Sequence, residues 1–168
     1  MSARVLAIIA LGSNVGDSQG ILSRAMERLE AHSSFPLLRS SFWQTTPVDC
    51  PPGSPPFVNA AVGLTPQRRE SPESLLEKLL LLEKKFGRKL KQVLNEPRRL
   101  DLDLITFGQE TRVTKHLVLP HPRAHTRRFV LQPLSEIAPD LVLPGQRSSV
   151  AALLAALDTP EKLVRLNP

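Results

Sequence analysis

Two aspartates, Asp101 and Asp103, stand one residue apart in the stretch 100–107, where leucines alternate with them. Successive side chains of a strand face opposite sides, so both aspartates face away from the leucines. At about 3.3 Å per residue, their Cα atoms would be roughly 6.6 Å apart. Carboxylates this close repel each other unless cations intervene, and Mg²⁺ prefers carboxylate oxygens together with substrate phosphates. The pair therefore predicts a divalent-metal site. The alternative is a strand face that is merely acidic, although Asp is depleted in strands.

A second strand, expected at 57–64, has the same alternation. Its even positions are apolar, whereas Phe57 and Asn59 face the other side. If both apolar faces lie under the same helices, these two residues share the open side of the sheet with the aspartates. A ring there can stack on a flat heterocycle, and an amide can read the donors and acceptors at its edge. The alternative is that Phe57 packs under a loop and Asn59 serves a turn.

Basic residues are concentrated just before the aspartate pair. The stretch 84–99 holds seven Lys or Arg residues and one acid, Glu96. Guanidinium groups beside metal-binding carboxylates suit phosphoryl transfer, because they stabilise charge that develops on phosphate oxygens. The stretch 120–129 adds a histidine, several arginines and a second candidate stacking ring, Phe129. A solvated basic loop is the alternative for 84–99.

Glu83 falls within the apolar stripe of a helix expected at 72–86, because it follows Leu76 by seven residues and Leu79 by four. A carboxylate in that stripe needs a partner or a ligand hydroxyl. The alternative is a Glu at the edge of the stripe that pairs with a nearby Lys.

The elements that must hold these side chains follow the order β-α-β-β-α-β. Asp17 or Ser18 can cap the first helix, Ser71 followed by proline starts the second, and Gly87 ends it. We expect strands at 5–11, about 37–45, 57–64 and 100–107, and helices at about 18–31, 72–86, near 131–137 and near 148–157. This order predicts an α+β, ferredoxin-like antiparallel sheet with helices on one face and a C-terminal helical extension. The other face is left for loops, the C-terminal segment or a ligand.

Length and composition limit the class of protein. The 168 residues fit a single domain, 1–168, and 41% hydrophobic with 23% charged residues is close to the globular average. No apolar run approaches the roughly 20 residues that span a bilayer. The single cysteine, Cys50, cannot form an internal disulfide, so we expect a reducing, cytoplasmic setting.

The charge balance indicates the kind of partner. There are 22 basic and 16 acidic residues, a net charge of +6, which favours an anionic ligand. Aromatic residues make up only 4%, too few for a surface that stacks many bases. The charge therefore suits a compact phosphate ligand better than a long strand, and the alternative is a basic protein with no anionic ligand. We also expect no nucleic acid and no membrane as partners, and a monomer.

Seven short motifs occur in order between residues 5 and 145. They read Leu-Gly-Ser-Asn-x-Gly-Asp at 11–17, Thr-Thr-Pro-Val at 45–48, Pro-Phe-Val-Asn-Ala-Ala at 56–61, Glu-x-x-x-Gly-Arg at 83–88, Pro-Arg-x-Leu-Asp-Leu-Asp at 97–103, Pro-His-Pro-Arg at 120–123 and Arg-x-Phe-Val-Leu-x-Pro-Leu at 127–134. Each is weak alone, but the series is specific. It resembles the 6-hydroxymethyl-7,8-dihydropterin pyrophosphokinase family of folate biosynthesis.

The resemblance implies a ferredoxin-like fold and transfer of pyrophosphate from ATP to the pterin hydroxymethyl group, with release of AMP. It implies that Asp101 and Asp103 bind two Mg²⁺ ions and that Arg88 and Arg98 act on the phosphates, these four being the catalytic residues. The residues that it places at ATP are Glu83, Arg88, Arg98, His121 and Arg127. Those that it places around the pterin are Thr45, Val48, Phe57, Asn59 and Phe129, with the ring between the two phenylalanines.

Two positions depart from the family pattern. Leu90 and Leu94 stand where the family often has arginine, so a weakly active homologue that binds pterin or nucleotide is one alternative. An RNA-binding module is another, because the same element order serves RNA readers, which need two or three exposed aromatic residues on their central strands. An assay for AMP with ATP, Mg²⁺ and the hydroxymethyl pterin separates the three.

Overall fold

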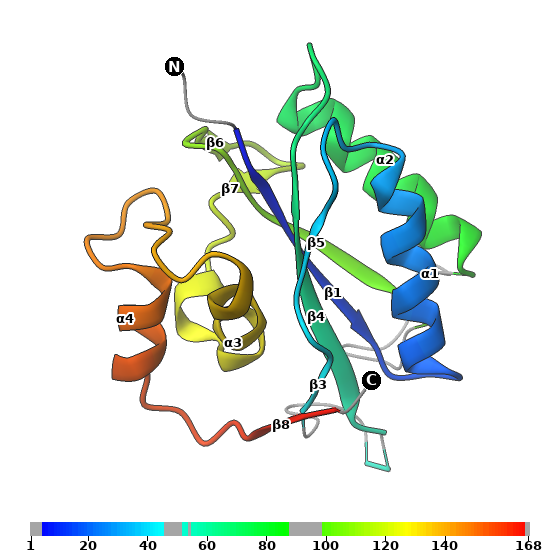
Figure 1. Cartoon of the computed structure of the whole chain (residues 1–168), viewed down its shortest axis with the longest axis vertical. Helices are drawn as coiled ribbons and strands as arrows, with labels where there is room; N and C mark the ends of the chain where they lie inside the picture. The colour runs from blue at the N-terminus through cyan, green and yellow to red at the C-terminus, as the bar shows by residue number, and fades with distance from the viewer. Residues whose placement is uncertain (1–4, 46–51, 54, 88–98, 167–168) are drawn as a thin grey trace.

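The computed structural model describes residues 5–45, 52–53, 55–87 and 99–166, and shows a central sheet with helices on both sides (Figure 1). The strands are β1 (Ala7–Ser13), β2 (Leu38–Arg39), β3 (Trp43–Thr45), β4 (Phe57–Leu64), β5 (Asp101–Phe107), β6 (Arg112–Val113), β7 (Val118–Leu119) and β8 (Leu163–Arg165). The helices are α1 (Ser18–Glu30), α2 (Pro72–Lys85), α3 (Arg128–Ile137) and α4 (Val150–Ala156), with a 3₁₀ turn at Ala124–Thr126.

The main sheet is antiparallel and has the order β5-β1-β4-β3-β8, with β2 also paired to β4. The hairpin β6-β7 forms a separate two-stranded sheet. The predicted α+β, ferredoxin-like class is confirmed. Because β5 lies at one edge of the main sheet, no strand of that sheet lies beside its outer side in the described part of the chain.

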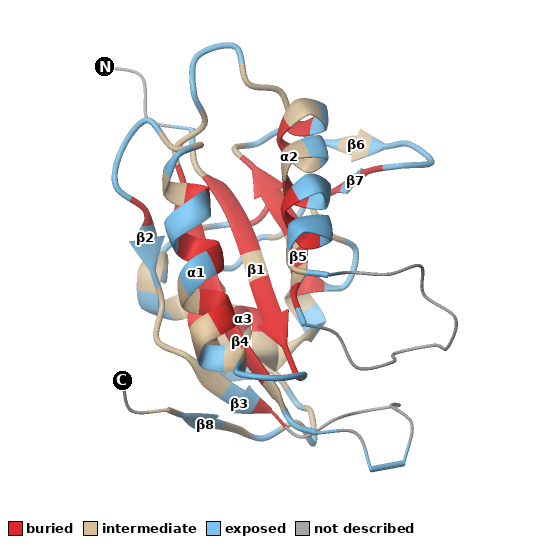
Figure 2. Ribbon diagram, turned by 90° about the vertical axis from the view of Figure 1, so that its right-hand side faces the viewer, coloured by how far each residue is buried: buried red, intermediate tan, exposed pale blue. Residues whose placement is uncertain are grey.

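Two apolar clusters lie on opposite faces of the sheet. Leu100, Leu102 and Leu104 pack in the cluster beneath α1 and α2, as the alternation predicted. Figure 2 looks onto this layer and shows buried residues on the sides of both helices that face the strands. On the other face, α3 packs against the sheet through a second cluster that includes Ile8 and Leu131. The C-terminal segment therefore covers part of the face that the sequence left open for it.

Local capping explains where α1 and α2 begin. The Asp17 side chain accepts a hydrogen bond from the backbone N–H of Gly20, so it is the N-cap of α1. Ser71 and Ser74 form a reciprocal capping box at the start of α2. Gly87 has φ of +89° just beyond that helix, a conformation that glycine adopts without steric cost. All three predictions from the sequence are confirmed.

The prediction of a single strand at about 37–45 is wrong, because the structure divides this stretch into β2 and β3. Arg39 pairs with Val62 and Trp43 with Asn59, so three residues of one strand lie opposite two of the other. The Ser40 hydroxyl accepts the N–H of Ala61 at 2.8 Å in place of a backbone carbonyl. This side-chain bond accommodates the extra residue, which is the geometry of a bulge.

Helix α3 begins at Arg128, earlier than the expected 131, although its first residues are not typical of a helix start. The Glu161 carboxylate accepts a hydrogen bond from the N–H of Phe129 at 3.4 Å. A negative group at a helix N-terminus is favourable. This partner is distant in the sequence, so local pattern could not reveal it.

Candidate active site

The open side of the sheet is organised around Gly12 on β1. Gly12 pairs with Asn59 on β4 and with Asp101 on β5, so the three residues form one row across adjacent strands. A Cβ atom placed on Gly12 would lie 3.3 Å from Asn59 Oδ1 and 3.7 Å from Phe57 Cδ1. The missing side chain therefore leaves room between the amide and the aspartate. The strand expected at 5–11 stops one residue short of Gly12, whereas β1 continues to Ser13 and its alternation places Gly12 on this face.

The two aspartates are placed as predicted relative to the leucines. Asp101 is opposite Gly12 and Asp103 is opposite Ala10, both small residues, and both aspartates are partly exposed. In the described part of the chain, no group of three or more His, Cys, Asp or Glu side chains could hold a metal by itself. Two carboxylates are nevertheless a suitable set for Mg²⁺ that also binds substrate phosphates, because this ion usually takes one or two carboxylates.

Three of the expected pterin residues lie together on the other side of Gly12. Asn59 is 6% exposed and donates from Nδ2 to Thr45 Oγ1 at 2.9 Å. Thr45 is paired with Phe57 in the β3-β4 ladder. This bond fixes which way the Asn59 amide faces, so a buried polar edge lies next to a partly exposed ring. The expectation that Asn59 serves only a turn does not fit a residue in the middle of a ladder.

His121 and Arg127 lie near the aspartate pair, and the negative charge of the pair affects the pKa of each. Burial lowers the pKa of His121, and the nearby Arg127 and Arg123 lower it further, whereas Asp101 acts in the opposite direction. Burial and Arg123 likewise lower the pKa of Arg127, while Asp103, then Glu161 and Asp101, oppose them. His121 Nδ1 accepts the N–H of Arg123 at 3.3 Å. This cluster concentrates positive charge beside two carboxylates.

Phe129, the second expected stacking ring, is partly exposed at the start of α3. The guanidinium carbon of Arg127 lies 5.3 Å from the centre of its ring, within cation–π range. Phe129 therefore adjoins the residues expected to meet phosphate.

Glu83 is placed differently from the aspartates. It is 1% exposed, and its Oε2 accepts the backbone N–H of Leu102 at 2.8 Å. The sequence allowed a ligand hydroxyl or a nearby Lys as its partner, and the bond seen here is to a backbone N–H. Val48, Arg88 and Arg98 lie outside the described residues, as do Leu90 and Leu94.

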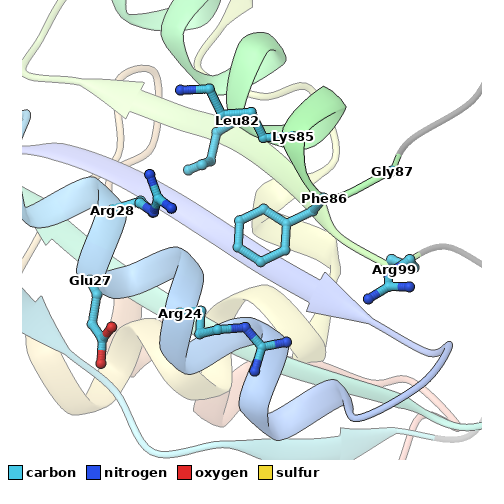
Figure 3. A pocket seen from close by; sticks show the side chains of 8 residues that line it. All are labelled: Arg24, Glu27, Arg28, Leu82, Lys85, Phe86, Gly87 and Arg99. Atoms are coloured by element: carbon cyan, nitrogen blue, oxygen red, sulfur yellow. The ribbon is translucent and has the colours of Figure 1, made fainter.

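A basic cleft of about 540 Å³ lies between α1 and the C-terminal end of α2 (Figure 3). Its lining residues are Arg24, Glu27, Arg28, Leu82, Lys85, Phe86, Gly87 and Arg99. Four are basic and one is acidic, so the cleft adds positive charge near the two ends of the stretch 88–98. None of the described residues expected to bind ATP or pterin lines it, so we do not place the substrates there.

The fold and the arrangement of these side chains fit an α+β enzyme that transfers a phosphate-containing group. The family model described as 7,8-dihydro-6-hydroxymethylpterin-pyrophosphokinase matches residues 8–139. The chain is 36% identical over 165 residues to 2-amino-4-hydroxy-6-hydroxymethyldihydropteridine pyrophosphokinase of Haemophilus influenzae, covering 98% of this chain and 99% of that protein. It is 37% identical over 152 residues to the enzyme of the same name from Synechocystis, covering 90% and 76%.

Solved structures show the same fold. A crystal structure of HPPK-DHPS in complex with substrates superimposes with a TM-score of 0.70 at 11% identity, covering 92% of this chain and 43% of that longer one. A wild-type Plasmodium falciparum HPPK-DHPS structure gives the same TM-score and identity, covering 92% and 44%. The chain thus spans less than half of those proteins.

The chain belongs to the 6-hydroxymethyl-7,8-dihydropterin pyrophosphokinase family. It transfers pyrophosphate from ATP to the hydroxymethyl group of the dihydropterin in folate biosynthesis. The resemblance carried by the seven motifs is confirmed, and so is the enzymatic function. Among the described residues, no helix combines the length and apolar character needed to cross a membrane.

Proposed function

We propose that this pyrophosphokinase is Mg²⁺-dependent and that its two substrates meet across Gly12. The observation that carries the proposal is the row Asn59–Gly12–Asp101, in which adjacent strands place an amide and a carboxylate on either side of one glycine. The amide side suits the pterin, and the carboxylate side suits the ATP phosphates. Residues far apart in the sequence thereby act on one reaction.

On the pterin side, Phe57 and Phe129 hold the ring between them, and Thr45, Val48 and Asn59 complete the pocket. The buried bond from Asn59 to Thr45 supports this role, because it leaves the amide oxygen fixed while the ring next to it is partly exposed. An oriented amide distinguishes the donor and acceptor pattern at the edge of a heterocycle.

On the phosphate side, Asp101 and Asp103 would hold two Mg²⁺ ions between themselves and ATP. Ions held there would neutralise charge that develops on the phosphates. His121 and Arg127 contact ATP, and Arg88 and Arg98 act on the phosphates as catalytic residues. The lowered pKa of His121 supports binding by a neutral imidazole that donates a hydrogen bond. The motif resemblance also assigns Glu83 to the nucleotide, but its described hydrogen bond is to the Leu102 backbone N–H, so we do not count it among the proposed ATP contacts.

The transfer forms one bond and breaks one. The pterin hydroxyl oxygen bonds to the β-phosphorus of ATP, and the bond from that phosphorus to the oxygen bridging to the α-phosphate breaks. AMP leaves with that oxygen, and the hydroxyl proton is lost to the surroundings. The chain's part is positioning and charge stabilisation, which dominate phosphoryl transfer.

The test is production of AMP from ATP, Mg²⁺ and 6-hydroxymethyl-7,8-dihydropterin by the wild type and by Asp101→Asn and Asp103→Asn. We expect a wild type that releases AMP only with all three present, and variants slower by about a hundredfold or more because oriented charge stabilisation is lost. Near-normal turnover in either variant at saturating Mg²⁺ would overturn the metal assignment. AMP release that is barely detectable even in the wild type would support the weakly active alternative.

We further propose a single domain, 1–168, that is monomeric, cytoplasmic and limited to small-molecule partners. Strands from both ends of the chain, β1 and β8, belong to the same main sheet, which supports a single domain. Light scattering after size-exclusion chromatography, repeated with a generic RNA oligomer, tests it. A dimer, or co-elution with the RNA, would contradict it.

A further inference from the structure

The strand that carries both aspartates, β5, lies at an edge of the main sheet and pairs there with β1. An edge strand presents N–H and C=O groups that no neighbouring strand satisfies. In an antiparallel pair, alternate residues turn these groups away from the partner strand. Leu102, between Asp101 and Asp103, is one of them, and its N–H donates to a side chain of α2.

The acceptor is Glu83, near the C-terminal end of α2. Its Oε2 is 2.8 Å from the Leu102 nitrogen, and the residue is 1% exposed. Burying a carboxylate is costly unless hydrogen bonds compensate. A bond from an N–H to a carboxylate is about twice as strong as one between neutral groups. Glu83 thus holds the backbone between the two aspartates from inside the helical layer.

A second bond holds the same edge three residues further on. The backbone N–H of His121 donates to the Ile105 carbonyl at 2.8 Å. The outer edge of β5 is therefore fixed at Leu102 by α2 and at Ile105 by the segment that carries His121. Asp103 lies between these two bonds, so its direction relative to His121 depends on both.

We infer that Glu83 is a positioning residue for the metal-binding aspartates, acting through the Leu102 N–H to hold Asp101 and Asp103 toward the open side of the sheet. The inference rests on the proposed role of the two aspartates. It deepens that role, because it makes the helical layer a determinant of metal affinity although Glu83 lies on the opposite side of the strand from the site. The described bond gives this buried carboxylate a partner on the strand that carries both aspartates.

The test compares Glu83→Ala with Glu83→Gln, which keeps an acceptor oxygen but not the charge. The matched control is Glu70→Ala, because Glu70 is a buried carboxylate that pairs with Lys78 at 2.7 Å and has no bond to β5. The first measurement is amide hydrogen exchange of Leu102 in the protein without metal or substrate. The second is the Mg²⁺ concentration for half-maximal AMP release, together with the Kd of ATP without Mg²⁺.

In Glu83→Ala, we expect the Leu102 amide to exchange at least tenfold faster and the Mg²⁺ requirement to rise at least fivefold, with the Mg²⁺-free Kd of ATP changed less than twofold. In Glu83→Gln, we expect most of the Leu102 protection and a Mg²⁺ requirement within about twofold of the wild type. Glu70→Ala should change neither, whatever its unfolding temperature.

Faster exchange at Leu102 with an unchanged Mg²⁺ requirement would overturn the inference. So would a Glu83→Gln protein that keeps its Leu102 protection but binds Mg²⁺-free ATP as poorly as Glu83→Ala, since that pattern indicates a direct nucleotide contact. If Glu83→Ala does not fold, Glu83→Gln still decides, because a fivefold rise in its Mg²⁺ requirement with Leu102 protected would also overturn it. Failure of the proposed function appears elsewhere, as normal turnover in Asp101→Asn and Asp103→Asn.

Discussion

Asn59 and Asp101 face the same residue, Gly12, from the strands on either side of β1. The row fixes their order across the sheet, amide then glycine then carboxylate, without any contact between their side chains being required. Because Gly12 has no side chain, the space above it is open to a ligand that binds between Asn59 and Asp101. The separation of pterin and phosphate functions thus follows from strand register.

A side chain at position 12 should therefore impair binding. A Cβ there lies 3.3 Å from Asn59 Oδ1, tighter than an ordinary contact, and the extra methyl groups of valine would project into the site. We expect Gly12→Ala to weaken pterin binding severalfold and Gly12→Val by about tenfold or more, which is roughly 1.4 kcal/mol. Isothermal titration of the pterin in the presence of a non-hydrolysable ATP analogue measures this.

The control for position 12 is Ile8→Val, on the same strand but in the buried cluster on the α3 side. It should lower the free energy of unfolding by about 0.5–1.5 kcal/mol and leave pterin affinity unchanged. Equal losses of pterin affinity in the two variants would show that position 12 acts through general stability.

Removal of the Phe57 ring should affect one substrate only. A stacked ring contributes on the order of 0.5–1.5 kcal/mol beyond the area it buries, so Phe57→Ala should weaken pterin binding by about 1 kcal/mol or more. ATP affinity should barely change, because Phe57 lies on the amide side of Gly12. Calorimetry with each ligand separately checks this, and a loss confined to ATP would assign Phe57 to a different pocket.

The faces of the strands could be predicted from the sequence because a two-residue period is a local property. Asp101 and Asp103 were separated from their leucines in this way, and the caps Asp17 and Ser71 act within one helical turn. What could not be predicted depends on partners distant in the chain. The Glu83 carboxylate meets the N–H of Leu102, 19 residues away.

The break between β2 and β3 and the early start of α3 have the same cause. Ser40 substitutes a hydroxyl for a backbone acceptor opposite Ala61. Glu161 supplies a carboxylate to the N–H of Phe129, 32 residues before it. In both cases, a polar side chain accepts a hydrogen bond from a backbone N–H. The periodicity of apolar residues along the chain carries no information about such a bond.

The bond between Asn59 and Thr45 gives a prediction with a conservative control. Thr45→Val removes the acceptor of Asn59 Nδ2 in a place where Thr45 is 7% exposed. A buried donor left without a partner costs about 1–3 kcal/mol, so the free energy of unfolding in urea should fall by that amount. Pterin affinity should fall as well, because the amide is no longer held.

Thr45→Ser keeps the hydroxyl, so it should retain most of the wild-type free energy of unfolding and most of the pterin affinity. If Thr45→Ser binds the pterin as weakly as Thr45→Val, the threonine methyl group rather than the hydrogen bond is what the site requires.

His121 makes stability depend on pH. Its native pKa lies below the ordinary 6.5, first because of burial and then because of Arg127 and Arg123. As the pH falls, His121 in the unfolded chain therefore binds a proton before His121 in the native protein does. The native state loses stability as the pH falls from the ordinary pKa to the lower native pKa. We expect the free energy of unfolding to fall more steeply between about pH 7.5 and pH 5 in the wild type than in His121→Gln, which cannot be protonated.

The difference between the wild type and His121→Gln isolates the contribution of His121, although the pKa of a second histidine, His32, is also lowered. Burial, then Lys78, lowers the pKa of His32 too, while Glu70 opposes them, but His32 is present in both proteins and its contribution cancels in the difference. Urea unfolding of ligand-free, metal-free protein at several pH values gives the two curves. Curves that stay parallel over the whole range would show that His121 is protonated as easily in the native protein as in the unfolded chain, and would remove the support for a neutral imidazole at the phosphates.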